Sequence, residues 1–296
     1  AECGGDHPTG LCATRIPSRA TTEGKLPTRE APSTRKGALT LGDKVGNFTL
    51  TQVIGRGSTS QVFLADNEVT QAVAAVKALH PNLHDDADMV RRFESEARTT
   101  NLVRHEHVVE IYDIGLHSGW QHYIQLELLE GNTLAALLEQ HLDPSWAVRI
   151  VLQLCSALGT AHSKGVVHRD LKPANVFVLD RGGLPHSKLV DFGMARREQL
   201  DRGEQRTRIG TIVGTAAYMS PEQTQGLEAD GRSDIYSLGV LMFRMATGRL
   251  PFEAPTVIEA MTAQLTQEPP RPRDLKPEIP EAYEEVILQC LAKSPA

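Results

Sequence analysis

The sequence has few residues that could cross-link the chain or anchor it in a bilayer. Four of its 296 residues are cysteines, and they are too scattered to form a disulfide framework: Cys3, Cys12, Cys155 and Cys290. The last two lie in apolar helical patterns, which predicts buried, inert thiols. No uncharged apolar run reaches the length of about 18 residues that suggests a membrane-spanning helix. We therefore predict no membrane segment within this chain and a reducing, cytoplasmic setting.

The chain also has fewer basic than acidic residues. The chain has 31 Lys and Arg against 37 Asp and Glu, which gives a net charge of −6. Non-specific nucleic-acid binding requires a basic face, so we predict no nucleic-acid partner. A hydrophobic content of 40% with 23% charged residues is ordinary for a globular protein.

Residues 1–44 contain few large apolar side chains. The stretch Ile16–Gly37 is rich in Thr, Pro, Arg and Lys and cannot bury enough surface to offset the entropy of ordering. We therefore predict that residues 1–44 form a disordered tail and linker. Ahead of it, CGGDHPTGLC places His7 between Cys3 and Cys12. Two interpretations stay open, a partial zinc ribbon at residues 3–12 that needs further ligands, and a plain tail. We favour the tail.

Hydrophobic periodicity predicts a strand-rich part followed by a helix-rich part. Strands are predicted at residues 47–55, 60–66, 72–79, 108–115 and 122–129. Helices are predicted at residues 87–104, 133–141, 146–165, 232–248 and 256–267. This order predicts an α+β fold with two lobes, and a cleft between lobes is a natural ligand site.

A glycine-rich stretch, GRGSTSQV from Gly55 to Val62, lies between the first two predicted strands. Glycines allow backbone amides to approach a phosphate closely. Alone, the stretch is explained equally well by a hairpin turn. It is not a dinucleotide-binding fingerprint, because a strand rather than a helix follows it.

Lys77 ends an apolar run and is costly to bury unless it is paired. Glu96 on the following helix is the predicted partner, because Glu94 would point about 200° away at ~100° per residue. The alternative is a lysine whose head reaches solvent.

The stretch VHRDLKPAN, Val167–Asn175, concentrates charge in a loop, since Pro173 excludes a regular helix. Farther on, Asp191 follows a short predicted strand. Carboxylate and carboxamide oxygens suit Mg²⁺, so Asp191 and Asn175 are predicted metal ligands.

In order and context, these motifs resemble those of protein kinases, most closely the bacterial eukaryotic-like (Hanks-type) serine/threonine kinases. The residues that carry the resemblance are Gly55, Gly57, Lys77, Glu96, His168-Arg169-Asp170, Asn175, Asp191-Phe192-Gly193 and Ser220-Pro221-Glu222. The resemblance covers residues 48–296, and it implies an N-lobe at residues 48–129 and a C-lobe at residues 130–296.

The resemblance implies ATP with Mg²⁺, or Mn²⁺, as cofactors. Lys77, paired with Glu96, would hold the α- and β-phosphates, and Asp170 would accept or orient the proton of the attacking hydroxyl. The implied nucleotide-binding residues are Ile54, Gly55, Arg56, Gly57, Ser58, Thr59, Ser60, Gln61, Val62, Ala75, Lys77, Glu127, Leu129 and Phe177.

Further implied roles concern the surroundings of these groups. Leu126 would be the gatekeeper before the hinge Glu127–Leu129, and Val62, Ala75 and Phe177 would sandwich the adenine. His168 would pack towards Phe192. Asp234 would brace the backbone of the catalytic loop.

The resemblance also implies the acceptor. Lys172 resembles the lysine that contacts the transferred phosphate in serine/threonine kinases, and Thr215 would lie near Asp170 and Lys172. Protein substrates with Ser or Thr are the implied partners.

Arg169 resembles the arginine of kinases that are activated by phosphorylation of the activation segment, which here would run from Asp191 to Glu222. The resemblance also allows a dimer of kinase domains for autophosphorylation. Thr207 is the predicted site and Thr211 the second choice. Unmodified threonines are the alternative.

Three features depart from the family pattern. Ser60 replaces a frequent third glycine. Thr100 stands where an apolar side chain normally completes a stack with Phe192 and His168, which predicts a weaker assembled active state. The chain stops before an arginine that would pair with Glu222, and we expect the native chain to continue past Ala296.

Two other functions compete with an active protein kinase. A pseudokinase-like binding scaffold would usually have lost Lys77, Asp170 or Asp191, and all three are present. A small-molecule phosphotransferase of related fold would lack the long segment that ends in GTAAYMSPEQ, Gly214–Gln223.

Overall fold

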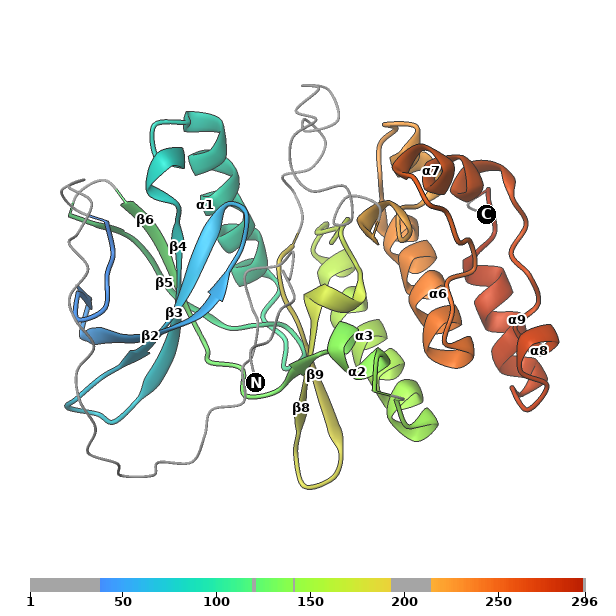
Figure 1. Ribbon diagram of the computed structural model, residues 1–296, viewed down its shortest axis with the longest axis horizontal. Coiled ribbons are helices and arrows are strands. Elements are labelled where there is room, and N and C mark those ends of the chain that lie inside the picture. The colour runs from blue at the N-terminus through green and yellow to red at the C-terminus, as the bar shows by residue number, and fades with distance from the viewer. Residues whose placement is uncertain (1–37, 119–120, 141, 193–213, 295–296) are drawn as a thin grey trace.

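The computed structural model describes residues 38–118, 121–140, 142–192 and 214–294. A strand-rich half and a helix-rich half lie side by side, and a small second sheet lies where they meet (Figure 1). This is the two-lobed α+β architecture that the sequence predicts.

The first half is built on a six-stranded antiparallel sheet with the order β1-β2-β3-β4-β6-β5. Its strands are β1 (Lys44–Val45), β2 (Phe48–Arg56), β3 (Ser60–Asp66), β4 (Val73–Leu79), β5 (Ile111–His117) and β6 (Gln121–Leu126). Strand β3 buries side chains on both of its faces, since the neighbouring Val62 and Phe63 are both buried and belong to different apolar clusters, and β4 is buried along nearly its whole length. Lys77 therefore lies on a central, buried strand.

Helix α1 (Ala87–Leu102) covers one face of this sheet and contacts β5 and β6 (Figure 1). The carboxylate of Asp86 accepts hydrogen bonds from two backbone N–H groups of the first turn and so caps the helix. Phe93 and Ala97, four residues apart, are buried on the face towards the sheet. That spacing also brings Glu96 to the inner side of the helix.

The second half combines a three-stranded sheet with helices. The sheet has the order β7-β8-β9, formed by β7 (Asn132–Thr133), β8 (Val176–Asp180) and β9 (Pro185–Leu189). The helices are α2 (Leu134–Leu138), α3 (Pro144–Ser163), α5 (Pro221–Thr224), α6 (Gly231–Thr247), α7 (Val257–Thr266), α8 (Pro272–Leu275) and α9 (Glu281–Cys290). Single 3₁₀ turns occur at Pro81–Leu83 and Pro173–Asn175. Helix α6 is buried along most of its length and contacts both α3 and α9, so it forms the centre of this half.

All the strands and helices predicted from periodicity are present, with shifts at their ends. Strand β5 begins at Ile111 rather than at Val108, because Val108 instead forms a parallel bridge to Leu189 of the second sheet. The β8–β9 hairpin was only partly predicted: the strand before Asp191 was expected, and its partner strand was not.

The prediction of a buried thiol is wrong for Cys155, which is exposed, and Cys290 is only partly buried. Helix α3 buries Leu154 and Ala157, and Cys155 follows Leu154 by one residue. A rotation of about 100° turns it to the outer face. Within the described ranges, no helix is both long enough and apolar enough to cross a membrane.

The two leucines Leu152 and Leu154 of α3 allow a matched test of this core. Leu154 is fully buried, whereas Leu152 is 64% exposed. We expect Leu154→Ala to lower the free energy of unfolding by about 2–5 kcal/mol, because it removes buried surface and leaves a cavity. Leu152→Ala should change it by less than about 0.5 kcal/mol. Equal losses in urea denaturation would contradict this packing.

Candidate active site

The glycine-rich stretch forms the tight hairpin between β2 and β3. Gly55 pairs with Val62, and the N–H of Gly57 donates to the carbonyl of Ser60 at 2.8 Å. His80, just after β4, holds the tip of the hairpin: its N–H donates to the Thr59 carbonyl at 2.8 Å and its Nε2 lies 2.9 Å from the Gly57 carbonyl. The sequence analysis missed this contact of His80.

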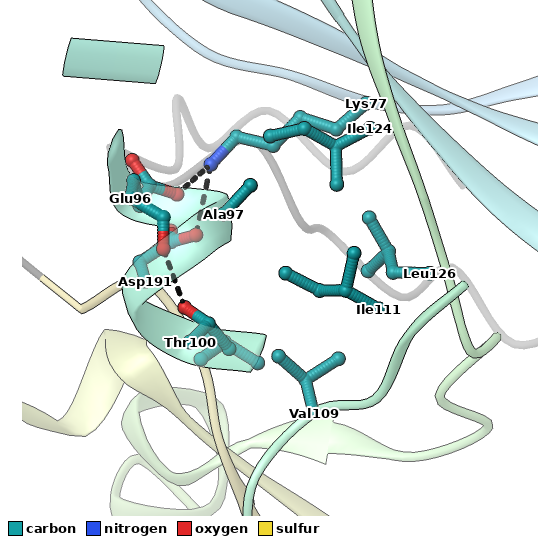
Figure 2. Close-up of a pocket in the computed structure, with 10 residues that line it drawn as sticks. Lys77, Glu96, Ala97, Thr100, Val109, Ile111, Ile124, Leu126 and Asp191 are labelled. Atoms are coloured by element: carbon teal, nitrogen blue, oxygen red, sulfur yellow. Dashed lines mark hydrogen bonds and ion pairs between the residues drawn. The ribbon is translucent and has the colours of Figure 1, made fainter. Parts of the chain in front are cut away.

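Lys77 of β4 lies between two carboxylates (Figure 2). Its Nζ is 2.7 Å from Oε1 of Glu96 and 2.8 Å from Oδ1 of Asp191, and the lysine is 8% exposed. The predicted choice of Glu96 over Glu94 agrees with this geometry, because Glu94 instead pairs with Arg98 and His122. Groups from β4, α1 and the segment after β9 thus meet at one ammonium.

The electrostatics of this group are those of one buried cation shared by two anions. Burial by itself would lower the pKa of Lys77, but the charges of Asp191 and Glu96 outweigh it and raise that pKa. The pKa of Glu96 is raised to about 7, mainly by burial. The ammonium of Lys77 lowers this pKa, and the negative charge of Asp191 raises it. Burial opposes ionisation of Asp191 too, yet Lys77 keeps the pKa of Asp191 below its usual value. A further cation beside Asp191 would balance the excess negative charge.

A second group of side chains surrounds Asp170 in the loop before β8. Lys172 Nζ lies 2.9 Å from Asp170 Oδ2 and 3.3 Å from Thr215 Oγ1. Asn175 donates through Nδ2 to the carbonyl of Asp170 at 2.8 Å and to its Oδ2 at 3.0 Å. Lys172 therefore links Asp170 to Thr215, whereas Lys77 and Glu96, the other two inferred catalytic residues, belong to the first group.

The backbone of this loop is fixed by the fully buried Asp234 of α6. Its carboxylate accepts hydrogen bonds from the N–H groups of His168 and Arg169, both at 2.8 Å. His162 of α3, which the sequence analysis did not single out, contacts the same carboxylate at 2.7 Å. This agrees with the implied bracing role of Asp234.

His168 connects the loop to the strand that leads to Asp191. A carbonyl only accepts, so the 3.1 Å contact to the Val190 carbonyl places a proton on Nε2 of His168. Its Nδ1 then accepts from the N–H of Asp170 at 3.2 Å. The imidazole also packs on Phe192 with ring centroids 4.7 Å apart, as the resemblance implies.

Two residues of the site have backbone conformations that side chains usually avoid. Arg169 has φ +64° and Asp191 has φ +55°. Such left-handed residues persist only where surrounding contacts hold them, and they concentrate at functional sites. The contacts of Asp234 and Lys77 supply that restraint here.

One buried acceptor in the site has no protein partner. Asn175 is fully buried, and both of its hydrogen bonds to Asp170 are donated by Nδ2. Its Oδ1 has no hydrogen-bond partner in the described part of the chain. A buried unpaired oxygen is costly unless something else binds it. This oxygen and the carboxylate oxygens of Asp191 are hard donors of the kind that suits Mg²⁺.

The side chains implied for the adenine site belong to one apolar cluster. Val62, Ala75, Leu129 and Phe177 are buried in it together with Leu126. Glu127 follows Leu126, and its backbone N–H donates to the Glu110 carbonyl at 2.9 Å. Its side chain pairs with Lys188 at 2.6 Å.

A pocket opens beside Lys77, behind Leu126 (Figure 2). Its other lining residues are Glu96, Ala97, Thr100, Val109, Ile111, Ile124, Val190 and Asp191. Thr100 is buried, and its hydroxyl donates to the Glu96 carbonyl at 2.8 Å. Its polar group is therefore satisfied, and its effect on the assembled state stays a prediction.

The structure does not test several predicted residues. Thr207 and Thr211 lie outside the described residues, as do Cys3 and Cys12. The segment Gly214–Gln223 is described in full. There, Gln223 Nε2 donates to the Arg169 carbonyl at 2.8 Å, a contact without a local sequence signal.

The sequence matches the model of the protein kinase domain over residues 48–296. The chain belongs to the protein kinase family. Members of this family use ATP and a divalent cation. The match spans both halves of the structure and every residue of the two polar groups.

Serine/threonine-protein kinases of bacteria are among its relatives. Pkn1 of Myxococcus xanthus is 37% identical over 295 residues, which is 99% of this chain and 42% of Pkn1. PrkC of Bacillus subtilis is 33% identical over 252 residues, which is 84% of this chain and 38% of PrkC. The chain thus spans about two fifths of the length of these relatives.

Solved structures show the same fold. The kinase domain of PknI from Mycobacterium tuberculosis superposes with a TM-score of 0.64. It is 24% identical, and the match covers 87% of this chain and 92% of that chain. The fold class predicted from the resemblance is confirmed.

Proposed function

We propose that this chain transfers the γ-phosphoryl group of ATP to serine and threonine hydroxyls of proteins, in signal transduction. The observation that carries the proposal is the arrangement of Asp170, Lys172, Thr215 and Asn175 around one point, beside the Lys77–Asp191 pair. The serine/threonine kinases among its relatives support the same activity.

Lys77 holds the phosphates of the nucleotide in this proposal. Its ammonium is fixed by Glu96, so its position is set before ATP arrives. The hairpin from Ile54 to Val62 covers the phosphates with backbone amides. The apolar cluster of Val62, Ala75 and Phe177 takes the adenine. Since the N–H of Glu127 is engaged with Glu110, the carbonyl of Glu127 and the N–H of Leu129 are the hinge groups left for the base.

Asn175 and Asp191 hold the divalent cation. The unpaired, buried Oδ1 of Asn175 is the observation that favours this assignment. Mg²⁺ is the proposed ion, and Mn²⁺ suits the same oxygen donors. When bound, the cation neutralises charge on the transferred phosphoryl group.

Asp170 orients the acceptor hydroxyl. The hydroxyl oxygen bonds to the γ-phosphorus while the bond from that phosphorus to the β,γ-bridging oxygen breaks. ADP leaves, and the hydroxyl proton passes to the Asp170 carboxylate. Lys172, held between Asp170 and Thr215, faces the transferred group with a positive charge. This lysine and threonine are the residues that favour serine and threonine as acceptors.

Arg169 connects the site to the activation segment. Its Nε is buried and has no hydrogen-bond partner in the described part of the chain. A phosphate would provide the charged acceptor that this nitrogen lacks. We propose that this phosphate comes from phosphorylation of Thr207, or of Thr211, by a second copy of the chain.

Helix α1 offers a matched pair of variants to test this function. Glu96→Gln removes the anion that fixes Lys77, and Glu94→Gln changes a glutamate that binds Arg98 and His122 instead. We expect Glu96→Gln to lower kcat/KM roughly 10-fold or more, because a charge-assisted hydrogen bond contributes about 1.5–3 kcal/mol. Glu94→Gln should stay within about 2-fold. Both are assayed with Mg²⁺-ATP and matched peptides that carry Ser, Thr or Tyr. Equal effects of the two variants, or preference for Tyr, would contradict the proposal.

The role of Arg169 predicts a separate result. Phosphatase-treated wild type, incubated with Mg²⁺-ATP, should gain phosphate at Thr207 or Thr211, and its peptide kinase activity should rise. In Arg169→Gln, phosphorylation at those sites should no longer raise activity. Mass spectrometry maps the sites, and activity is compared before and after phosphorylation at matched occupancy. An unchanged activation ratio in Arg169→Gln would refute the role.

A further inference from the structure

Three side chains that the proposed kinase reaction does not use converge where the two halves meet. Glu106 and His107 lie in the loop between α1 and β5, and His186 lies in β9. One ligand atom from each of the three lies within 4.8 Å of the others. The two imidazoles are 7% and 8% exposed, with ring centroids 4.7 Å apart, and Glu106 is exposed.

The hydrogen bond of His107 prepares its other nitrogen for a metal. Nδ1 lies 2.9 Å from the carbonyl oxygen of Ser187, which only accepts, so Nδ1 carries the proton. Nε2 is then left with its lone pair. A histidine that ligates a metal commonly donates its second ring N–H to a carbonyl in this way.

His186 has a buried nitrogen that no protein group explains. Its Nε2 is buried and has no hydrogen-bond partner in the described part of the chain. Burial lowers the pKa of His186, and the charges of Arg181, His107 and Lys188 lower it further. These effects favour the neutral ring, which is the form that binds metals.

The strand on both sides of His186 is held in place by Gln153 of α3. Gln153 Nε2 donates to the Pro185 carbonyl at 2.8 Å. Gln153 Oε1 accepts from the N–H of Ser187 at 2.7 Å and from its hydroxyl at 2.8 Å. The carbonyl that orients His107 belongs to the same Ser187, so one glutamine positions both imidazoles.

Neighbouring groups limit the ligand set to these three side chains. His105 is engaged at both nitrogens, with Nε2 3.0 Å from Ser156 Oγ and Nδ1 accepting from the N–H of His107 at 3.1 Å. Lys188, whose charge would repel a cation, is paired with Glu127 at 2.6 Å. The carboxylate of Glu106 supplies the only negative charge among the three groups.

We propose that Glu106, His107 and His186 form a Zn²⁺ site that fastens the loop after α1 to β9. Two imidazoles and one carboxylate are a known zinc ligand set, and water completes the coordination. Ligands of a tetrahedral zinc at about 2.0–2.1 Å are roughly 3.4 Å apart, so a small closure of the three groups suffices.

The position of the site gives bound zinc a structural effect. The N–H of Leu189 donates to the His107 carbonyl at 2.8 Å, and the N–H of Val109 donates to the Leu189 carbonyl at 3.0 Å. Zinc would add a further link between these segments. One of them follows the helix that carries Glu96, and the other leads to Asp191. A metal that binds only the folded chain raises its stability in proportion to the logarithm of metal concentration.

Zinc binding is tested on the full chain with Cys3→Ser and Cys12→Ser, which removes thiol ligands from the tail. Zn²⁺ at about 100 times Kd should raise Tm by about 5–10 °C. Co²⁺ should give a visible d–d absorption band that Zn²⁺ abolishes. His186→Gln should lower the affinity at least 10-fold, and so should Glu106→Gln, which changes an exposed side chain and leaves the core intact. His117→Ala, a histidine of β5 away from the site, is the matched control.

Equal zinc-induced shifts in wild type, Glu106→Gln and His186→Gln would overturn the proposal, since the metal would then bind elsewhere. So would the absence of any shift in wild type. The metal titrations need no ATP or peptide, so their outcome is independent of the proposed kinase activity.

Discussion

The ammonium of Lys77 is the contact on which the site depends. It comes from the central strand of the large sheet and is shared by Glu96 of α1 and by Asp191 of the segment after β9. Three elements from both halves of the molecule must be in place for it to form. Because two carboxylates share one buried cation, the group keeps excess negative charge. A divalent cation beside Asp191 would balance this charge.

The site also depends on the contacts that hold the loop carrying Asp170 in place. Asp234 projects from the most buried helix of the chain and holds the backbone of His168 and Arg169, and His168 carries the restraint on to Val190. The left-handed conformation of Arg169 is tolerated because these bonds fix it. Asp170 is thereby held in one position before any substrate binds. Such preorganisation is what positional and electrostatic catalysis requires.

Sequence patterns predicted the features that depend on residues close together in the chain. Apolar residues that repeat every 2 or every 3.6 positions located the strands and the helices, respectively. The helical rotation of about 100° per residue selected Glu96 rather than Glu94 as the partner of Lys77. The same rotation places Cys155 on the outer face of α3, although the apolar helical pattern around it predicted a buried thiol. The contacts of Gln153 with Ser187 and of His107 with His186 span more than 30 and 75 positions, respectively. No periodicity encodes them, because they arise only when the two sheets and α3 pack together.

Phosphoryl transfer by wild type and Asp170→Asn, measured beside ATP binding in the same preparations, tests the central claim most directly. Asparagine keeps the shape of the side chain and removes the base. We expect transfer to a serine or threonine peptide to fall roughly 10²–10⁴-fold in Asp170→Asn while ATP affinity changes little. Transfer by Asp170→Asn at the rate of wild type would contradict it. A wild type that binds Mg²⁺-ATP and transfers nothing would instead be a binding scaffold.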